Sequence, residues 1–138
     1  MSKRREGREA ALQMLYSLDH VPAGTDHDLK EFWELRRADE AVQSHATALF
    51  RGIQAHREEI DARIAATVQN FRFERLAVVD RNILRLAVFE MFHDTAVPPV
   101  VSMNEAIEIA KRFGGEDSPR FINGVLDRII KDVPRPIR

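Results

Sequence analysis

The chain has 138 residues, of which 44% are hydrophobic and 31% charged, with a formal net charge of −1 and no cysteine. This length is enough for one globular domain with a substantial core, and the near-neutral charge argues against bulk affinity for nucleic acid. The lack of cysteine excludes disulfides, thiolate metal ligands and cysteine nucleophiles. Charged residues interrupt every apolar run, so we expect no membrane span, no secretory signal and a cytoplasmic protein.

Apolar residues recur at helical spacing along nearly the whole chain. A first helix near the N-terminus should end at residues 21–24, where the sequence is Val-Pro-Ala-Gly. A short helix is expected at 29–37. A long helical segment at 40–70 should break near His56 or Arg57, because the spacing between apolar residues widens there.

The helix expected at 75–92 is apolar over most of its circumference, so other helices should surround it. Pro98 and Pro99 predict an extended link after this helix. Ser102 and Glu105 have the spacing of a capping box, which predicts the start of the next helix. No tight turn between alternating strands is present. The sequence therefore predicts a single all-α domain of six or seven helices.

A short polar turn joins the last two predicted helices. Gly114 and Gly115 should end the first of them, at a position where a positive φ costs glycine little. Ser118 is the expected N-cap of the second helix, with Pro119 at its first position. Asp117, inside the turn, is also expected to act as a capping residue. Backbone N–H groups after Ser118 would form an anion site.

The segment 104–127, NEAIEIAKRFGGEDSPRFINGVLD, closely resembles the NusB family of bacterial antitermination factors, as do the arginine-rich first helix and Leu15-Tyr16-Ser17. The resemblance is strong at both ends and weak from about residue 21 to 61. It implies that residues 1–138 form a NusB-like RNA-binding domain of two packed antiparallel three-helix bundles.

The same resemblance implies a function and a set of partners. The implied protein is a transcription antitermination factor that binds boxA-like single-stranded RNA together with the ribosomal protein NusE. With other Nus factors it would keep RNA polymerase elongating through ribosomal RNA genes. Some family members self-associate through the RNA-binding face, so a homodimer is a further implied assembly.

The first eight residues carry four cationic side chains against one carboxylate, and the last eight are also basic. Basic ends on an acidic interior suggest a local phosphate-binding patch. On a helical wheel Arg5, Leu12 and Tyr16 share a narrow arc, where guanidinium groups could neutralise phosphates while the ring stacks on a base. The alternative is a solvated basic helix start with Tyr16 half-buried in the core. The residues expected to bind RNA here are Lys3, Arg4, Arg5, Arg8 and Tyr16.

Phe113, Arg120 and Phe121 flank the turn and complete the expected RNA-binding set. Both phenylalanines also occupy positions of the apolar stripe, so core packing is the competing interpretation for each. The resemblance implies that this turn and the aromatic residue after it lie at the RNA surface.

Asp80, Arg81 and Arg85 are the main polar residues of the otherwise apolar helix at 75–92. A polar strip of this kind is usually the solvent edge of a helix. The resemblance implies instead that this region contacts NusE, although the family usually has glutamate where this chain has Asp80.

No active site, metal site or cofactor is predicted. The five histidines form no i, i+4 pair and no HExxH arrangement, and His93 is expected to complement the dipole at a helix end. A first rival interpretation is the NusB-like RNA-binding module of ribosomal RNA cytosine methyltransferases. It is disfavoured because the chain ends at Arg138 without a methyltransferase domain or a catalytic cysteine. A second rival is a helical protein-interaction module that does not bind RNA.

Overall fold

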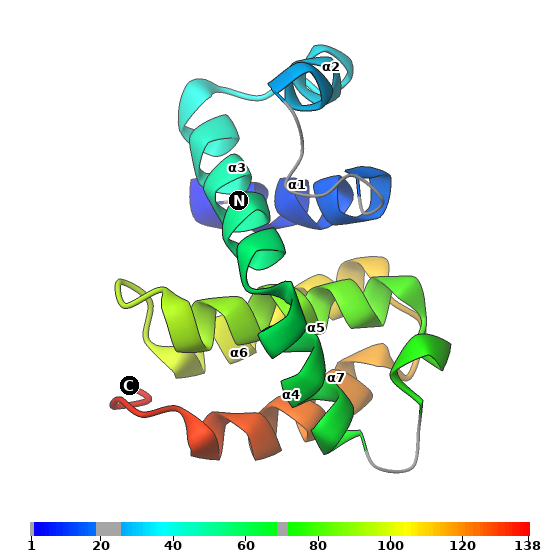
Figure 1. Cartoon of the computed structure of the whole chain (residues 1–138), viewed down its shortest axis with the longest axis vertical. Helices are drawn as coiled ribbons and strands as arrows, with labels where there is room; N and C mark the ends of the chain where they lie inside the picture. Colours follow the sequence, from blue (N-terminus) through cyan, green and yellow to red (C-terminus); the bar gives the residue numbers. More distant parts are fainter. Residues whose placement is uncertain (1, 19–25, 69–71) are drawn as a thin grey trace. The chain divides into compact units, whose positions relative to one another are not determined.

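The computed structural model describes residues 2–18, 26–68 and 72–138 (Figure 1). These ranges contain seven α-helices and two short 3₁₀ helices but no strand, which confirms the predicted all-α class. The chain divides into two compact units, the first ending at Ala55 and the second beginning at His56. None of the described helices is both long enough and apolar enough to cross a membrane.

The first unit contains α1 (Lys3–Leu18), α2 (Asp26–Leu35) and α3 (Glu40–Ala55), and the main packing within it is between α1 and α3. Gly7 of α1 is needed for this packing, because a Cβ at this position would collide with the ring of His45 on α3. The buried apolar residues of the two helices are Ala10, Ala11, Leu12, Met14 and Leu15 on α1 and Val42, Ala46, Leu49, Phe50 and Ile53 on α3.

Polar contacts attach α2 to α3. The indole Nε1 of Trp33 donates to Oγ1 of Thr47 at 3.3 Å, and Arg51 pairs with Asp26 at 3.0 Å. The helix begins three residues earlier than the predicted 29–37 and ends at Leu35. The predicted end of the first helix at 21–24 lies outside the described residues.

The second unit is built around α5 (Val78–His93), which packs against α4 (Arg57–Thr67), α6 (Pro99–Phe113) and α7 (Ser118–Ile129). The predicted break in the long segment is confirmed, because His56 separates α3 from α4. The prediction that other helices surround α5 is also confirmed. Nine consecutive or near-consecutive positions of this helix are buried, namely Asn82, Ile83, Leu84, Arg85, Leu86, Ala87, Val88, Glu90 and Met91.

The predicted start of α5 at residue 75 was wrong. Residues Phe73–Arg75 form a separate 3₁₀ helix, η1, and the backbone at Leu76 and Ala77 is extended before the helix begins at Val78. Apolar residues continue at helical spacing through this short connection, so the spacing could not show where α5 begins.

The predicted capping box was wrong as well. Pro98 is the N-cap of α6, with φ −59° and ψ 136°, and Pro99 is its first residue. Proline suits this position because its fixed φ is helical and its missing N–H would have had no partner in the helix. Ser102 is therefore inside the helix and buried, where its hydroxyl donates to Oε2 of Glu90 on α5 at 3.3 Å.

The turn between α6 and α7 is closed by Ser118 rather than by a glycine with positive φ. Gly114 is extended, with φ −89° and ψ −178°, and Gly115 has no positive φ either. The Oγ of Ser118 accepts a hydrogen bond from the Gly115 N–H at 2.9 Å. Asp117, not Ser118, occupies the N-cap position of α7, and its carboxylate makes no capping hydrogen bond.

The C-terminal segment after η2 (Ile130–Asp132) is fixed to the end of α5. The guanidinium of Arg135 donates to the carbonyl oxygens of Glu90, Met91 and Asp94 at 3.0, 3.0 and 2.8 Å. The Val100 N–H donates to the carbonyl of Ile137 at 2.8 Å. A cation at this point satisfies the last carbonyls of α5 and complements the negative end of its dipole.

Gly114→Ala should destabilise the protein far more than Gly115→Ala. A Cβ at Gly114 would lie 2.5 Å from Cβ of Ser118 and 2.8 Å from the Ala110 carbonyl, whereas one at Gly115 would lie 3.8 Å from the Ser118 Oγ. We expect a loss of about 1–3 kcal/mol for Gly114→Ala, as for overpacking, and a change within about 0.5 kcal/mol for Gly115→Ala. Urea unfolding of both variants measures the difference. Equal stabilities would mean that the turn does not require this close approach.

Candidate nucleic-acid interface

The start of α1 presents its basic side chains to solvent. Lys3 and Arg4 are exposed and Arg5 is half-buried. Lys3 forms an ion pair with Asp39, which also accepts a hydrogen bond from the Val42 N–H at 3.0 Å and so caps α3. The hydrogen bond between the two side chains raises the pKa of Lys3 and lowers the pKa of Asp39.

This ion pair leaves Lys3 able to meet an anion. The side chains of Lys3 and Asp39 are 65% and 47% exposed, and exposed ion pairs are weak because water screens them. A phosphate can therefore compete with Asp39 for the ammonium group. Lys3, Arg4 and Arg5 are the accessible cations at the start of α1.

Arg8 differs from what the sequence predicts. Its side chain was expected to contact phosphate, but the residue is only 3% exposed. A guanidinium at that depth cannot reach a ligand on the surface without leaving its buried position. On a helical wheel Arg8 lies at the edge of the arc of Arg5, Leu12 and Tyr16, toward the apolar stripe, and in the structure it is buried with that stripe.

Tyr16 is the exposed aromatic residue of α1. It is 69% exposed, although most of its neighbours on the helix are buried, and this excludes the alternative that its ring is half-buried in the core. An exposed ring on a basic helix can stack on an unpaired base, which is the main way that proteins recognise single-stranded RNA.

The residues around the turn of the second unit are partly accessible. Phe113 is 39% exposed, and the guanidinium of Arg112 lies 5.1 Å from its ring centre. Arg120 is exposed and Phe121 is half-buried. The residues predicted to bind RNA therefore belong to both units. In each unit they include at least one exposed cation and one accessible aromatic ring.

The three polar residues of α5 do not form one exposed strip. Arg85 is 4% exposed and makes two hydrogen bonds to the Asp61 carboxylate of α4, from Nε to Oδ1 at 2.8 Å and from Nη2 to Oδ2 at 3.0 Å. Its Nη1 donates to Oδ1 of Asn82 at 2.8 Å. The prediction that Arg85 contacts a partner protein at the surface was therefore wrong, because its buried guanidinium joins α4 to α5.

Asp80 and Arg81 remain near the surface at the start of α5. Both are half-buried. Arg81 donates to the carbonyl of Glu74 at 3.3 Å and lies 5.6 Å from the Phe73 ring centre. Oδ1 of Asp80 has no hydrogen-bond partner among the residues that the structure describes. This oxygen is buried, so the half-buried Asp80 can meet another molecule only through the rest of its side chain.

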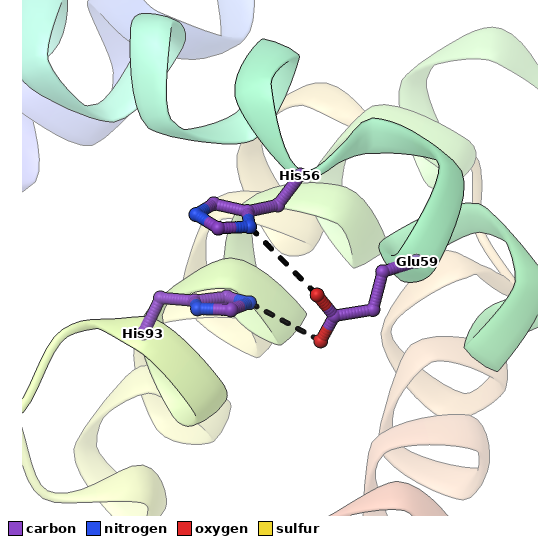
Figure 2. A group of neighbouring side chains, drawn as sticks. All are labelled: His56, Glu59 and His93. Atoms are coloured by element: carbon purple, nitrogen blue, oxygen red, sulfur yellow. Dashed lines mark hydrogen bonds and ion pairs between the residues drawn. The ribbon is translucent and has the colours of Figure 1, made fainter.

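A cluster that the sequence did not predict lies between α4 and α5. Figure 2 shows the rings of His56 and His93 stacked face to face, with the Glu59 carboxylate directed at both. The two histidines are far apart in sequence, so a search for i, i+4 pairs could not find them. The spacing of His56 and Glu59, three residues apart at a helix start, is the part of the cluster that was visible in the sequence.

Comparison with known proteins identifies the family. Residues 5–131 match the model of the NusB family. The chain belongs to the NusB family. Over 142 aligned residues it is 46% identical to the transcription antitermination protein NusB of Geotalea daltonii, with 97% of this chain and 98% of that relative covered.

Two solved NusB structures have the same fold. NusB of T. maritima is 35% identical, with a TM-score of 0.81 over 97% of this chain and 94% of that chain. A crystal structure of the antitermination factors NusB and NusE in complex with dsRNA is similar at 29% identity, with a TM-score of 0.81 over 95% of this chain and 98% of the matched chain. The fold and the family that the sequence predicts are therefore both confirmed.

Proposed function

We propose that this NusB-family protein is a transcription antitermination factor that binds boxA-like single-stranded RNA and the ribosomal protein NusE. In this proposal, residues 1–138 act as one RNA-binding domain. The protein acts by assembly rather than by catalysis, in the cytoplasm, within an RNA polymerase elongation complex that contains other Nus factors. The observation that carries the RNA part is the exposed ring of Tyr16 on the helix that begins with Lys3, Arg4 and Arg5.

The physical basis of RNA binding would be two separate interactions. Cations at the start of α1 would neutralise phosphates, and this contribution weakens as salt rises because counterions are released on binding. Tyr16 would add stacking, which requires an unpaired base but no particular sequence. In the second unit, we propose the same two roles for the cation of Arg120 and the rings of Phe113 and Phe121.

The NusE part rests on the start of α5 and on the family. The solved relative in complex with NusE shows that a protein of this fold can bind that partner. In this chain we assign the contact to Asp80 and Arg81, because Arg85 is occupied by Asp61. The half-buried carboxylate of Asp80 would meet a cationic group of NusE.

RNA electrostatics provide the first test. If Lys3, Arg4 and Arg5 contact about three phosphates, log K should fall with log salt at a slope of roughly −2, and the double variant Arg4→Ala/Arg5→Ala should flatten it by about 1.4. Titrations of a boxA-like RNA over a salt series measure both slopes. The matched control is Arg37→Ala, which removes an exposed arginine of the first unit outside α1. A slope changed equally by the control would place the phosphate contacts elsewhere, and the absence of any RNA binding would favour the plain protein-interaction module.

Tyr16 provides the second test. Tyr16→Ala should weaken binding of single-stranded RNA by roughly 1–3 kcal/mol, whereas Tyr16→Phe should retain most of the affinity because the ring remains. Because the residue is 69% exposed, neither change should lower the melting temperature by more than a few degrees. The same RNA annealed to its complement is the control ligand, since paired bases cannot stack on the ring. Equal losses for the single strand and the duplex would contradict the stacking role.

Asp80 and Arg85 provide the third test, because we assign them different roles. Asp80→Lys should weaken NusE binding by several kcal/mol through like-charge repulsion, with little change in RNA affinity and a loss of about 1–2 kcal/mol in stability from the reversed charge at the start of α5. Arg85→Ala should lower the free energy of unfolding by about 1.5–3 kcal/mol, because it removes the charged hydrogen bonds between α4 and α5 and leaves the Asp61 carboxylate with Arg57 alone, 3.6 Å away. Titration with NusE and urea unfolding separate the two effects. Normal NusE binding by Asp80→Lys would remove this residue from the interface.

A further inference from the structure

We propose that His56, Glu59 and His93 form a binding site for a divalent transition-metal ion of the zinc class. All three residues belong to the second unit, and the proposal does not depend on the proposed function. His56 directly precedes α4, Glu59 lies in the first turn of α4, and His93 is the last residue of α5. An ion bound here would join the start of one helix to the end of another.

The distances between ligand atoms are close to those that a metal ion requires. Nε2 of His93 lies 3.3 Å from Oε1 of Glu59, and Nδ1 of His56 lies 3.7 Å from Oε2 of Glu59. One ligand atom from each residue can be chosen so that all lie within 4.8 Å of one another. Two ligands of a tetrahedral zinc ion, each about 2.0–2.1 Å from the metal, are roughly 3.3 Å apart. The His93–Glu59 pair has this separation already, whereas the two imidazole rings must tilt apart so that an in-plane nitrogen of each can reach the same ion.

Stacking holds the two imidazoles in similar orientations. The rings of His56 and His93 are 3.9 Å apart between centres and inclined by 15°, and Phe89 lies beside His93 at 5.6 Å with an inclination of 24°. In Figure 2 both rings turn a nitrogen toward the carboxylate. Both nitrogens therefore start on the same side as the carboxylate, and the stack opens as they close on the ion.

The exposure of the side chains suits an ion that enters from solvent. His93 is 24% exposed, His56 42% and Glu59 47%, so the ligand atoms are accessible while the rings are partly covered. Three protein ligands leave one tetrahedral position for water. Two imidazoles and a carboxylate favour zinc, cobalt, nickel or copper, whereas magnesium and calcium prefer oxygen ligands alone.

Calorimetric titration of the full-length protein with zinc chloride tests this proposal, after removal of any polyhistidine tag and treatment with a chelator. We expect saturable binding of one ion per chain, and none with magnesium chloride. His93→Ala and Glu59→Gln should each lower the zinc affinity at least about tenfold, with the helical circular dichroism retained. Glu59→Gln is the more conservative change, because the amide keeps the size of the side chain but loses its charge.

His27→Ala is the matched control. His27 also faces a carboxylate, lying 3.1 Å from Glu31 on the exposed surface of α2, but among the residues that the structure describes no third ligand joins this pair. This variant should bind zinc as the unmodified protein does. Loss of binding in His27→Ala with unchanged affinity in Glu59→Gln would overturn the proposal, as would the absence of saturable binding in the unmodified protein.

Thermal unfolding gives a second, independent measurement. A ligand that binds only the folded state stabilises it by mass action, so zinc at about a hundred times its Kd should raise the melting temperature by roughly 5–10 °C. The shift should disappear in His93→Ala and on addition of a chelator. A shift of the same size in His93→Ala would place the bound ion elsewhere and contradict the assignment.

Discussion

The second unit depends on the burial of α5. This helix has apolar residues over most of its circumference, so it is stable only when α4, α6 and α7 cover it. Polar groups on such a helix are removed from water together with the apolar ones, and each then needs a partner from a neighbouring element. Arg85 finds Asp61 on α4, and Glu90 accepts from Ser102 on α6. The charges of α5 therefore determine which residues its neighbours must provide.

This constraint leaves few sites for binding other molecules. Side chains that compensate one another inside the unit cannot also bind RNA or protein without a large loss of stability. The groups that remain accessible lie at helix ends, as with the exposed Lys3 and Arg4 at the start of α1 and the half-buried Asp80 at the start of α5. Tyr16 is also accessible to another molecule, because its ring lies on the solvent side of α1, whose other face is buried. The exposed ring supports a role in binding because it lies on the helix that carries the exposed cations.

Much of the fold could be predicted from the sequence because helical periodicity is a local property. It gave the helices, the break at His56 and the surrounded position of α5. Helix ends were less predictable, since the capping box at Ser102 was plausible until the structure showed that α6 starts at Pro99. The spacing of residues also could not show which charged side chains are exposed to solvent and which are neutralised by a partner inside the fold. Arg85 lies on a polar strip of the helical wheel, but whether that strip meets water depends on a carboxylate 24 positions away.

The same limit explains why the two basic ends of the chain have different roles although their compositions are similar. At the N-terminus, Lys3 and Arg4 are exposed, and Lys3 pairs with an exposed carboxylate that water screens. At the C-terminus, Arg135 donates to three backbone carbonyls at the end of α5, and so serves the fold. Carbonyl acceptors exist at every residue and leave no trace in the sequence, so a charge count cannot reveal this interaction. Arg135 provides the positive charge expected of His93 at the helix end, and this leaves the His93 ring to pair with Glu59 across α4 and α5.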